Sequence, residues 1–198
     1  MAKIDMTLVK QLRERTGLGM MDCKKALEET GGDIEKAVDL LRKKGAAVAA
    51  KRAGKETSEG IVHAYIHPGS QVGVLLELNC ETDFVARTDD IKNFAHDICL
   101  HIAALKPLYL SPEDVDPKFL EREKDIIREQ LADAGKPEKM VEKIVEGKLN
   151  KLYSEICLMK QQFVKNDQMT IEQVVEELIG KTGEKIQIRR FSRFEIGA

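Results

Sequence analysis

Residues 60–78 read GIVHAYIHPGSQVGVLLEL, two apolar runs on either side of a short polar segment. Both runs, 60–66 and 72–78, are rich in the β-branched and bulky side chains that are typical of β-strands. The intervening HPGSQ contains proline and glycine, which favour tight turns. The sequence therefore predicts a β-hairpin, which other elements of the chain must cover.

The segments that follow this hairpin predict four helices and one further strand. Their apolar residues recur at helical spacing, and Thr88 and Thr170 give typical N-cap signals. Gly135 and Lys136 separate two charged amphipathic segments, which we expect to pair as a helical hairpin. The last segment alternates apolar and polar residues, as a strand does. The expected helices occupy residues 88–105, 117–134, 137–153 and 170–180, and the expected strand occupies residues 185–191.

The amino-terminal part of the chain predicts three short helices. Thr7 and Asp33 are the expected N-caps of the first and third helices. Gly17, Gly31 and Gly45 are expected to end the three helices, because glycine tolerates the left-handed backbone found at helix C-termini. The expected helices cover residues 7–16, 20–30 and 33–45.

Together these patterns predict an α+β fold. We expect a three-helix module at residues 1–45, a basic linker at 46–56 and an α+β core at 57–198. In the core, a small three-stranded antiparallel sheet packs with helices and a helical hairpin. Hydrophobic residues make up 42% of the 198 residues, which is enough to build a buried core.

The charge and hydropathy of the chain restrict its class. Its 32 basic and 34 acidic residues nearly balance, which argues against the broad basic surface of a dedicated nucleic-acid-binding protein. No segment approaches the roughly 18 to 20 apolar residues of a membrane span, and the first residues lack the apolar region of a signal peptide. We therefore expect a cytoplasmic protein.

Two basic segments each allow two interpretations. Residues 42–55, RKKGAAVAAKRAGK, carry no acid; they form either a solvated helix end and linker or a contact surface for an acidic partner or RNA. Residues 189–194, RRFSRF, interleave basic and aromatic side chains as nucleic-acid-binding surfaces do. A strand with one buried apolar face and one solvated basic face explains the second pattern equally well.

The sequence contains no recognisable catalytic or metal-binding pattern. GKTG at residues 180–183 resembles the end of a phosphate loop, but Val175 occupies the position of its first glycine and no strand precedes it. His63 and His67 share a strand face without further ligands. We expect no enzymatic activity, catalytic residue, metal or cofactor. The cysteines form no C-x-x-C pair and are expected to be buried free thiols, with an intermolecular disulfide as the alternative: Cys23, Cys80, Cys99 and Cys157.

Two longer motifs carry a resemblance to a known family. Residues 12–27, LRERTGLGMMDCKKAL, and residues 77–87, ELNCETDFVAR, closely resemble the two signature motifs of bacterial elongation factor Ts. The resemblance continues in the same order over nearly the whole chain, for example through GKPEKMVEKIVEGKL at residues 135–149 and RFEIG at residues 193–197. The chain resembles the short form of the family, which has a single copy of the core.

This resemblance implies a function and a partner. It implies a guanine-nucleotide exchange factor that binds elongation factor Tu with GDP, perturbs its magnesium and phosphate site, and promotes GDP release in translation elongation. The three helices would form a ubiquitin-associated-like module that docks on the GTPase domain. Because short members have one core copy, the resemblance also implies a homodimer, in a complex of two factors with two GTPases.

The resemblance also assigns partner-binding roles to individual residues. The family element that disturbs the magnesium site of the GTPase corresponds here to Thr82, Asp83, Phe84 and Val85. The partner-facing positions of the amino-terminal module and linker correspond to Met20, Lys24 and Arg52.

The role of Phe84 differs between the residue spacing and the family resemblance. By its spacing alone, Phe84 would be a hydrophobic staple against the following helix, which carries the apolar Ile91. The resemblance instead makes Phe84 a wedge that is buried in an apolar cleft of the partner. Thr82 and Asp83 are expected to cap the turn of Phe84, and Asp83 would either take part in this cap or accept a hydrogen bond from the partner.

Two other functions remain open at this point. The three-helix unit could bind ubiquitin-like or nascent-chain partners while the core only dimerises, and binding would then be indifferent to guanine nucleotide and magnesium. RNA binding through the linker and residues 189–193 would give an affinity that falls steeply with salt. The nearly balanced charge argues against the second of these.

Overall fold

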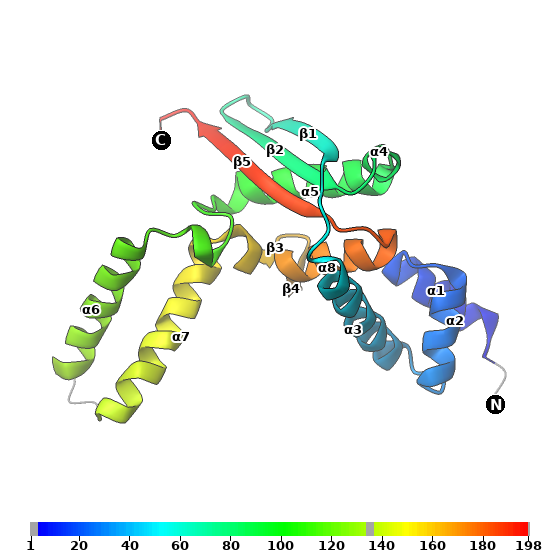
Figure 1. Ribbon diagram of the computed structural model, residues 1–198, viewed down its shortest axis with the longest axis horizontal. Helices are drawn as coiled ribbons and strands as arrows, with labels where there is room; N and C mark the ends of the chain where they lie inside the picture. Colours follow the sequence, from blue (N-terminus) through cyan, green and yellow to red (C-terminus); the bar gives the residue numbers. More distant parts are fainter. Residues whose placement is uncertain (1–3, 134–136, 198) are drawn as a thin grey trace. The chain divides into compact units, whose positions relative to one another are not determined.

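The computed structural model describes residues 4–133 and 137–197 and has the expected α+β fold (Figure 1). The α-helices in this part of the chain are α1 (Met6–Thr16), α2 (Met20–Glu29), α3 (Ile34–Arg52), α4 (Asp83–Ala86), α5 (Asp89–Leu105), α6 (Pro117–Asp133), α7 (Glu138–Ile156) and α8 (Ile171–Thr182). The strands are β1 (Glu59–Ile66), β2 (Val72–Cys80), β3 (Gln162–Phe163), β4 (Asn166–Thr170) and β5 (Gln187–Glu195).

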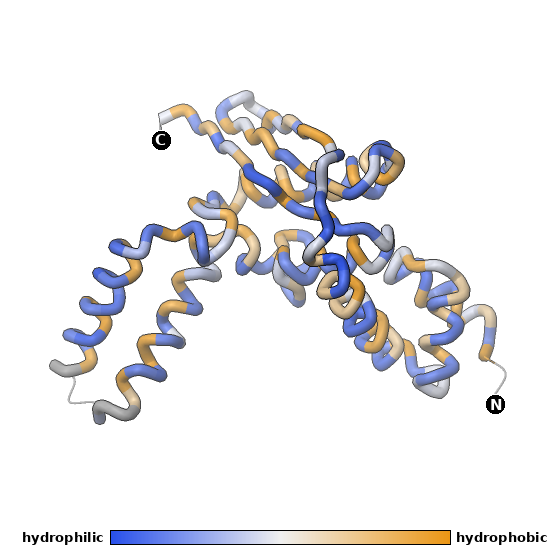
Figure 2. Tube along the Cα trace, in the orientation of Figure 1, coloured by the Kyte–Doolittle hydropathy of each residue, from blue (hydrophilic) through white to orange (hydrophobic). Residues whose placement is uncertain are grey.

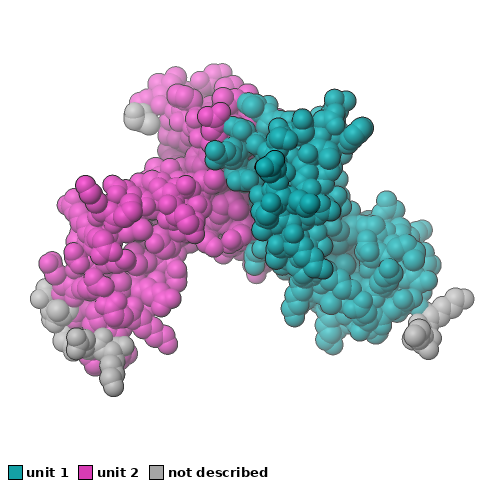
Figure 3. All heavy atoms as spheres, viewed as in Figure 1, with its two compact units in different colours: residues 1–62, 77–94, 173–189 teal, residues 63–76, 95–172, 190–198 magenta. Residues whose placement is uncertain are grey.

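The chain divides into two compact units (Figure 3). The first unit comprises residues 1–62, 77–94 and 173–189. The second unit comprises residues 63–76, 95–172 and 190–198. Each unit is therefore built from segments that are distant in the sequence.

Local hydrogen bonds set the ends of the first three helices. Asp5 caps α1, because its carboxylate accepts a hydrogen bond from the Thr7 N–H at 2.9 Å. The cap predicted at Thr7 is wrong. Asp5 lies directly before the first residue of α1, and its carboxylate is a better acceptor than the hydroxyl of Thr7. Gly17 ends α1 with a left-handed φ of 66°, and Asp33 caps α3, both as predicted.

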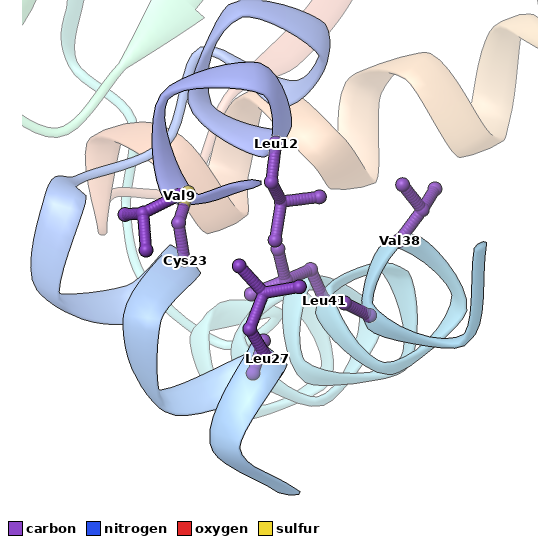
Figure 4. Packing of buried hydrophobic residues seen from close by; sticks show 8 residues of the cluster. Val9, Leu12, Cys23, Leu27, Val38 and Leu41 are labelled. Atoms are coloured by element: carbon purple, nitrogen blue, oxygen red, sulfur yellow. The ribbon is translucent and has the colours of Figure 1, made fainter. Parts of the chain in front are cut away.

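α1, α2 and α3 pack around one apolar cluster in the first unit. The side chains of Leu12, Leu27 and Leu41 converge from the three helices (Figure 4). Each buried leucine contributes about 1.5–3 kcal/mol to the stability of the folded state. The buried members of the cluster are Val9, Leu12, Cys23, Ala26, Leu27, Ala37, Val38 and Leu41.

α3 does not end at Gly45 but continues to Arg52. The prediction that Gly45 stops the helix is wrong, and most of the predicted linker at residues 46–56 is helical. Gly45 serves a close approach to α8 instead: a Cβ built on Gly180 would lie 2.9 Å from the Cα of Gly45. Glycine on both helices lets their backbones touch, which larger residues would prevent.

This close approach predicts that Gly180→Ala destabilises the protein. The added methyl group would collide with backbone that cannot move aside, at a cost of about 1–3 kcal/mol. Gly147→Ala is the matched control, because Gly147 lies within α7 and a Cβ there meets nothing within 4 Å. The control should gain about 0.5–1 kcal/mol from helix propensity. Thermal unfolding measures both; a Gly180→Ala protein as stable as the Gly147→Ala protein would contradict the account.

The predicted hairpin is confirmed as β1 and β2, which form a small antiparallel sheet in the order β1-β2-β5. At the hairpin turn the His67 N–H donates to the Val72 carbonyl at 2.9 Å. In the second unit, the His96 ring on α5 lies edge-on to His63 and Tyr65 of β1, with ring centroids 5.6 and 5.4 Å away. α5 therefore covers this face of the hairpin.

β5 begins and ends later than predicted, and its last residues reverse the expected burial. The side chain of Phe194 is 71% exposed, whereas that of Arg193 is only 12% exposed. Arg193 pairs with Glu195 at 2.8 Å, and Lys106 pairs with the same carboxylate at 2.9 Å. Arg193 and Lys106 lower the pKa of Glu195 to about 2. The strand therefore follows the apolar-in, basic-out pattern at Arg189, Arg190 and Phe191, but not at Arg193 and Phe194.

The predicted helical hairpin is confirmed as α6 and α7. Hydrophobic residues recur between hydrophilic ones along both helices (Figure 2). Arg128 of α6 donates to Glu142 of α7 at 3.1 Å. Ala134 and the predicted turn at Gly135 and Lys136 lie outside the described residues. The buried side chains between the two helices are Ile127, Leu131, Val145 and Leu149.

Short elements escaped prediction. α4 has four residues, fewer than are needed for a helical periodicity to show. β3 and β4 form a separate antiparallel pair, and the polar residues at the start of β4 hide its strand character.

The described part of the chain contains no helix that is long and apolar enough to cross a membrane.

A buried histidine joins three segments of the second unit. His101 is fully buried, and its Nε2 lies 2.9 Å from the Oε1 of Gln161. Its Nδ1 accepts a hydrogen bond from the Val164 N–H at 3.2 Å, so His101 is neutral with its proton on Nε2. Gln161 in turn donates to the Glu155 carbonyl at 2.8 Å. Burial lowers the pKa of His101, although its hydrogen bond to Gln161 opposes this effect.

The lowered pKa of His101 predicts a loss of stability in acid. The unfolded chain takes up the proton first, so stability should fall as the pH drops below about 6.5. His101→Leu removes this titration. The variant should be less stable at pH 7.5 by about 1–3 kcal/mol, because it leaves polar groups unpaired, but its stability should depend less on pH. Thermal unfolding between pH 7.5 and 5 measures both slopes, and equal slopes would refute the assignment.

Candidate functional site

The segment that follows β2 folds into a capped turn. Thr82 is the N-cap of α4, and its Oγ1 accepts a hydrogen bond from the Val85 N–H at 3.4 Å. This confirms the cap expected at Thr82. Ala86 at the other end of α4 is buried and anchors the turn. Asp83, Phe84 and Val85 therefore lie on a short helical turn whose two ends are held.

Phe84 points away from the rest of the protein. Its side chain is 78% exposed, more than any other large apolar side chain of the described residues. The staple against the following helix is therefore wrong for this structure, because a staple would bury the ring. An exposed aromatic ring on a turn with fixed ends is suited to insertion into a partner.

Asp83 supplies a negative charge beside Phe84. Its carboxylate pairs with Arg87 at 2.8 Å, one helical turn later; the Arg87 side chain is largely exposed and that of Asp83 is partly exposed. Such surface pairs contribute about 0.3–0.5 kcal/mol and exchange partners readily. Asp83 can therefore turn to a cation or donor of a bound partner at little cost.

Two acidic residues connect this turn to segments far away in the sequence. Glu184 accepts hydrogen bonds from the N–H and the hydroxyl of Thr82, at 3.1 and 2.7 Å. Glu81 pairs with Arg52 at 3.0 Å and accepts from the N–H of Lys185 at 2.7 Å. Sequence analysis missed Glu81, Glu184 and Lys185, because contacts across about a hundred residues leave no local pattern.

The residues assigned to the amino-terminal module and linker have different surroundings. Arg52 at the end of α3 is joined to the turn through its ion pair with Glu81. Met20 begins α2 and packs against the three-helix cluster. Lys24 lies on α2 with its side chain 44% exposed, 3.8 Å from Glu28. The structure thus brings Arg52 to the turn, whereas Met20 packs against the three-helix cluster and Lys24 is a partly exposed residue of α2.

The chemistry around the turn is suited to binding. Cys80 is buried and donates its S–H to the Thr82 carbonyl at 3.1 Å. Burial and, to a smaller extent, the nearby Glu184 raise the pKa of Cys80, so it is not an activated nucleophile. All four cysteines are buried free thiols. Among the described residues there is no group of three or more His, Cys, Asp or Glu placed to hold a metal ion.

Comparisons with known proteins agree with the motifs. The family model described as Elongation factor TS matches residues 21–198. Elongation factor Ts of Desulfosudis oleivorans is 56% identical over 197 residues, covering 100% of both chains. That of Thermotoga petrophila is 55% identical and covers 98% of this chain and 97% of its own length. That of Desulforamulus reducens is 54% identical and covers 100% of this chain and 91% of its own length.

Proposed function

Because the chain belongs to the elongation factor Ts family of translation elongation factors, we propose that it is a guanine-nucleotide exchange factor for elongation factor Tu. In this proposal it binds elongation factor Tu with GDP, perturbs the magnesium and phosphate site, and promotes GDP release. It is not an enzyme in the usual sense, since no covalent step is involved. The observation that carries the proposal is the exposed Phe84 on a turn that is held at both ends.

Exchange requires only a difference in binding free energy. The factor must bind more tightly to the state of the GTPase in which the magnesium and phosphate contacts are spoiled. By thermodynamic reciprocity, GDP then weakens binding of the factor by the same ratio. GTP at cellular concentrations completes the cycle by displacing the factor.

Phe84 is the proposed wedge in this mechanism. Burying an exposed phenylalanine in an apolar cleft contributes about 2–3 kcal/mol, enough to hold apart elements that otherwise pack together. Asp83 is placed to compete for the cation or donors of the opened site. Thr82 and Val85 supply the cap and the backbone hydrogen bond that shape the turn.

The three-helix cluster is proposed to dock on the GTPase domain. We propose that residues 1–45 form a ubiquitin-associated-like module, followed by the linker at 46–56 and the core at 57–198. The exposed Lys24 supports a charged contact on α2, with Met20 at the start of the same helix. α3 crosses the boundary at residue 45, so a rigid helix would connect the module and the linker. Action on a translation factor implies the cytoplasm.

Phe84→Ala tests the wedge. The variant should slow GDP release by about 30-fold or more, the factor that corresponds to losing 2–3 kcal/mol of binding in the open state. Its thermal midpoint should hardly change, because the ring is 78% exposed. Release of fluorescent GDP from elongation factor Tu, chased with unlabelled GDP, measures the rate.

Leu108→Ala is the matched control for this test, since Leu108 is 71% exposed and lies in the second unit. It should exchange GDP as the wild type does. Normal exchange by Phe84→Ala, together with a thermal midpoint that drops by many degrees, would instead make Phe84 a structural residue.

A homodimer is also proposed, giving a complex of two factors with two GTPases. It is supported by an apolar depression of about 410 Å³ in the second unit, on the hairpin and the end of β5. An exposed apolar surface of this kind is typical of a contact between proteins. The exposed large side chains that line it are Ile66, Leu75, Phe194 and Ile196.

Phe194→Glu should prevent this dimer. A carboxylate at the centre of an apolar contact is costly, so the variant should be monomeric where the wild type is dimeric. Leu108→Glu, at a side chain with the same 71% exposure, should remain a dimer. Sedimentation equilibrium at micromolar concentrations measures the mass. A monomeric wild type, or a dimer that only Leu108→Glu disrupts, would contradict the proposed contact.

A further inference from the structure

The segment GKTGEK at residues 180–185, which lacks the context of a phosphate loop, has another role in the structure. α8 ends within it, and the Gly183 N–H donates to the Ile179 carbonyl at 2.8 Å. Gly183 has a φ of 73°, a left-handed conformation that favours glycine. This turn brings Glu184 and Lys185 against the segment that follows β2.

Glu184 contacts Thr82 through two hydrogen bonds. The Thr82 N–H donates to Oε2 at 3.1 Å, and the Thr82 hydroxyl donates to Oε1 at 2.7 Å. The same hydroxyl oxygen accepts from the Val85 N–H at 3.4 Å. Because the hydroxyl proton points to Glu184, its lone pairs are free to face Val85. Glu184 therefore orients the N-cap of α4.

A second bridge anchors the same segment to the end of α3. Glu81 accepts the Lys185 N–H at 2.7 Å and pairs with Arg52 at 3.0 Å. The Nζ of Lys185 donates to the carbonyls of Ala53 and Lys55, at 2.8 and 2.9 Å. Glu184 thus projects from a segment that is itself tied to α3.

α4 depends on contacts from outside itself. A helix of one turn is not stable alone, because each hydrogen bond must fix several backbone dihedrals. The buried Ala86 holds one end of the turn, and the contact between Glu184 and Thr82 holds the other. The ring of Phe84 lies between these two points and is exposed.

We propose that Glu184 is a positioning residue, which acts through Thr82 to hold the α4 turn in one conformation and so presents Phe84 ready for insertion into the partner. A turn that is already ordered loses less conformational entropy on binding. The consequence for exchange rests on the proposed function, whereas the conformation of the turn does not.

Three substitutions separate this role from general stability. Glu184→Gln keeps the shape of the side chain but removes its charge, which weakens the hydrogen bonds that Thr82 donates to it. Thr82→Val removes the hydroxyl with little change in volume. Glu142→Gln is the matched control, since Glu142 also accepts a long-range hydrogen bond, from Arg128 at 3.1 Å on the helical hairpin.

The first measurement needs no partner. The chain has no tryptophan, so Phe84→Trp introduces a single one on the turn, whose fluorescence can be excited apart from that of the 3 tyrosines. Time-resolved anisotropy of this protein should show a larger amplitude of nanosecond local motion after Glu184→Gln and an unchanged amplitude after Glu142→Gln. Equal amplitudes in all three proteins would overturn the proposal.

The second measurement uses GDP release from elongation factor Tu with Phe84 in place. Glu184→Gln should lower the maximal release rate about tenfold, the effect of weakening one hydrogen bond to a charged group. The half-saturating concentration of the factor should stay within about twofold, because the rest of the contact surface is intact. If Glu184 only stabilised the fold, Glu184→Gln would lower the thermal midpoint without lowering the maximal release rate at a nearly unchanged half-saturating concentration.

Combining the variants tests whether Glu184 acts through Thr82. In a Thr82→Val background, Glu184→Gln should have a much smaller effect on the release rate than it has alone. Fully additive effects would overturn the proposal. Wild-type exchange by Glu184→Gln would overturn it while leaving the proposed function in place. If the wild type itself does not release GDP, the proposed function fails, and the anisotropy measurement still decides the role of Glu184.

Discussion

The contact between Glu184 and Thr82 determines how the candidate site is displayed. The Glu184 carboxylate accepts two hydrogen bonds from Thr82, 102 positions earlier in the sequence, and it lies on a segment that is tied to α3 through Lys185. The turn of α4 is too short to form by itself, so its geometry follows from these outside contacts. An exposed phenylalanine on a mobile loop would lose much of its binding free energy in becoming ordered.

The packing of the first unit also depends on contacts between segments that are distant in the sequence. Gly45 and Gly180 allow α3 and α8 to touch, and α8 leads directly into the segment that carries Glu184. The three-helix cluster is joined to this arrangement by the uninterrupted α3. A substitution that separates the two helices is therefore expected to disturb the turn of Phe84 as well as stability.

Patterns within the sequence predicted the elements whose apolar residues repeat regularly. Local propensity and spacing predicted the hairpin at residues 60–78, the paired helices α6 and α7, and the caps at Asp33 and Thr82. Features that depend on tertiary contacts were missed. Gly45 was predicted as a helix stop, yet it lies inside α3, where the lack of a side chain allows Gly180 of α8 to approach closely.

In the candidate site, too, local features were predicted and long-range contacts were missed. The motif at residues 77–87 could be located through its resemblance to a family, and its cap through local pattern, but the partners of Thr82 and Glu81 could not. At Arg193 and Phe194 the alternation failed, because Arg193 is held inside by Glu195 and Ala103 while Phe194 stays exposed.

Release of labelled GDP from elongation factor Tu, with and without this protein, tests the central claim most directly. The account predicts faster release with the protein at physiological magnesium. It also predicts a much smaller acceleration once magnesium is chelated, because chelation already removes the magnesium contact that the factor is proposed to disturb. Release at the same rate with and without the protein would contradict the account. An acceleration that is indifferent to magnesium would contradict the proposed action on the magnesium site.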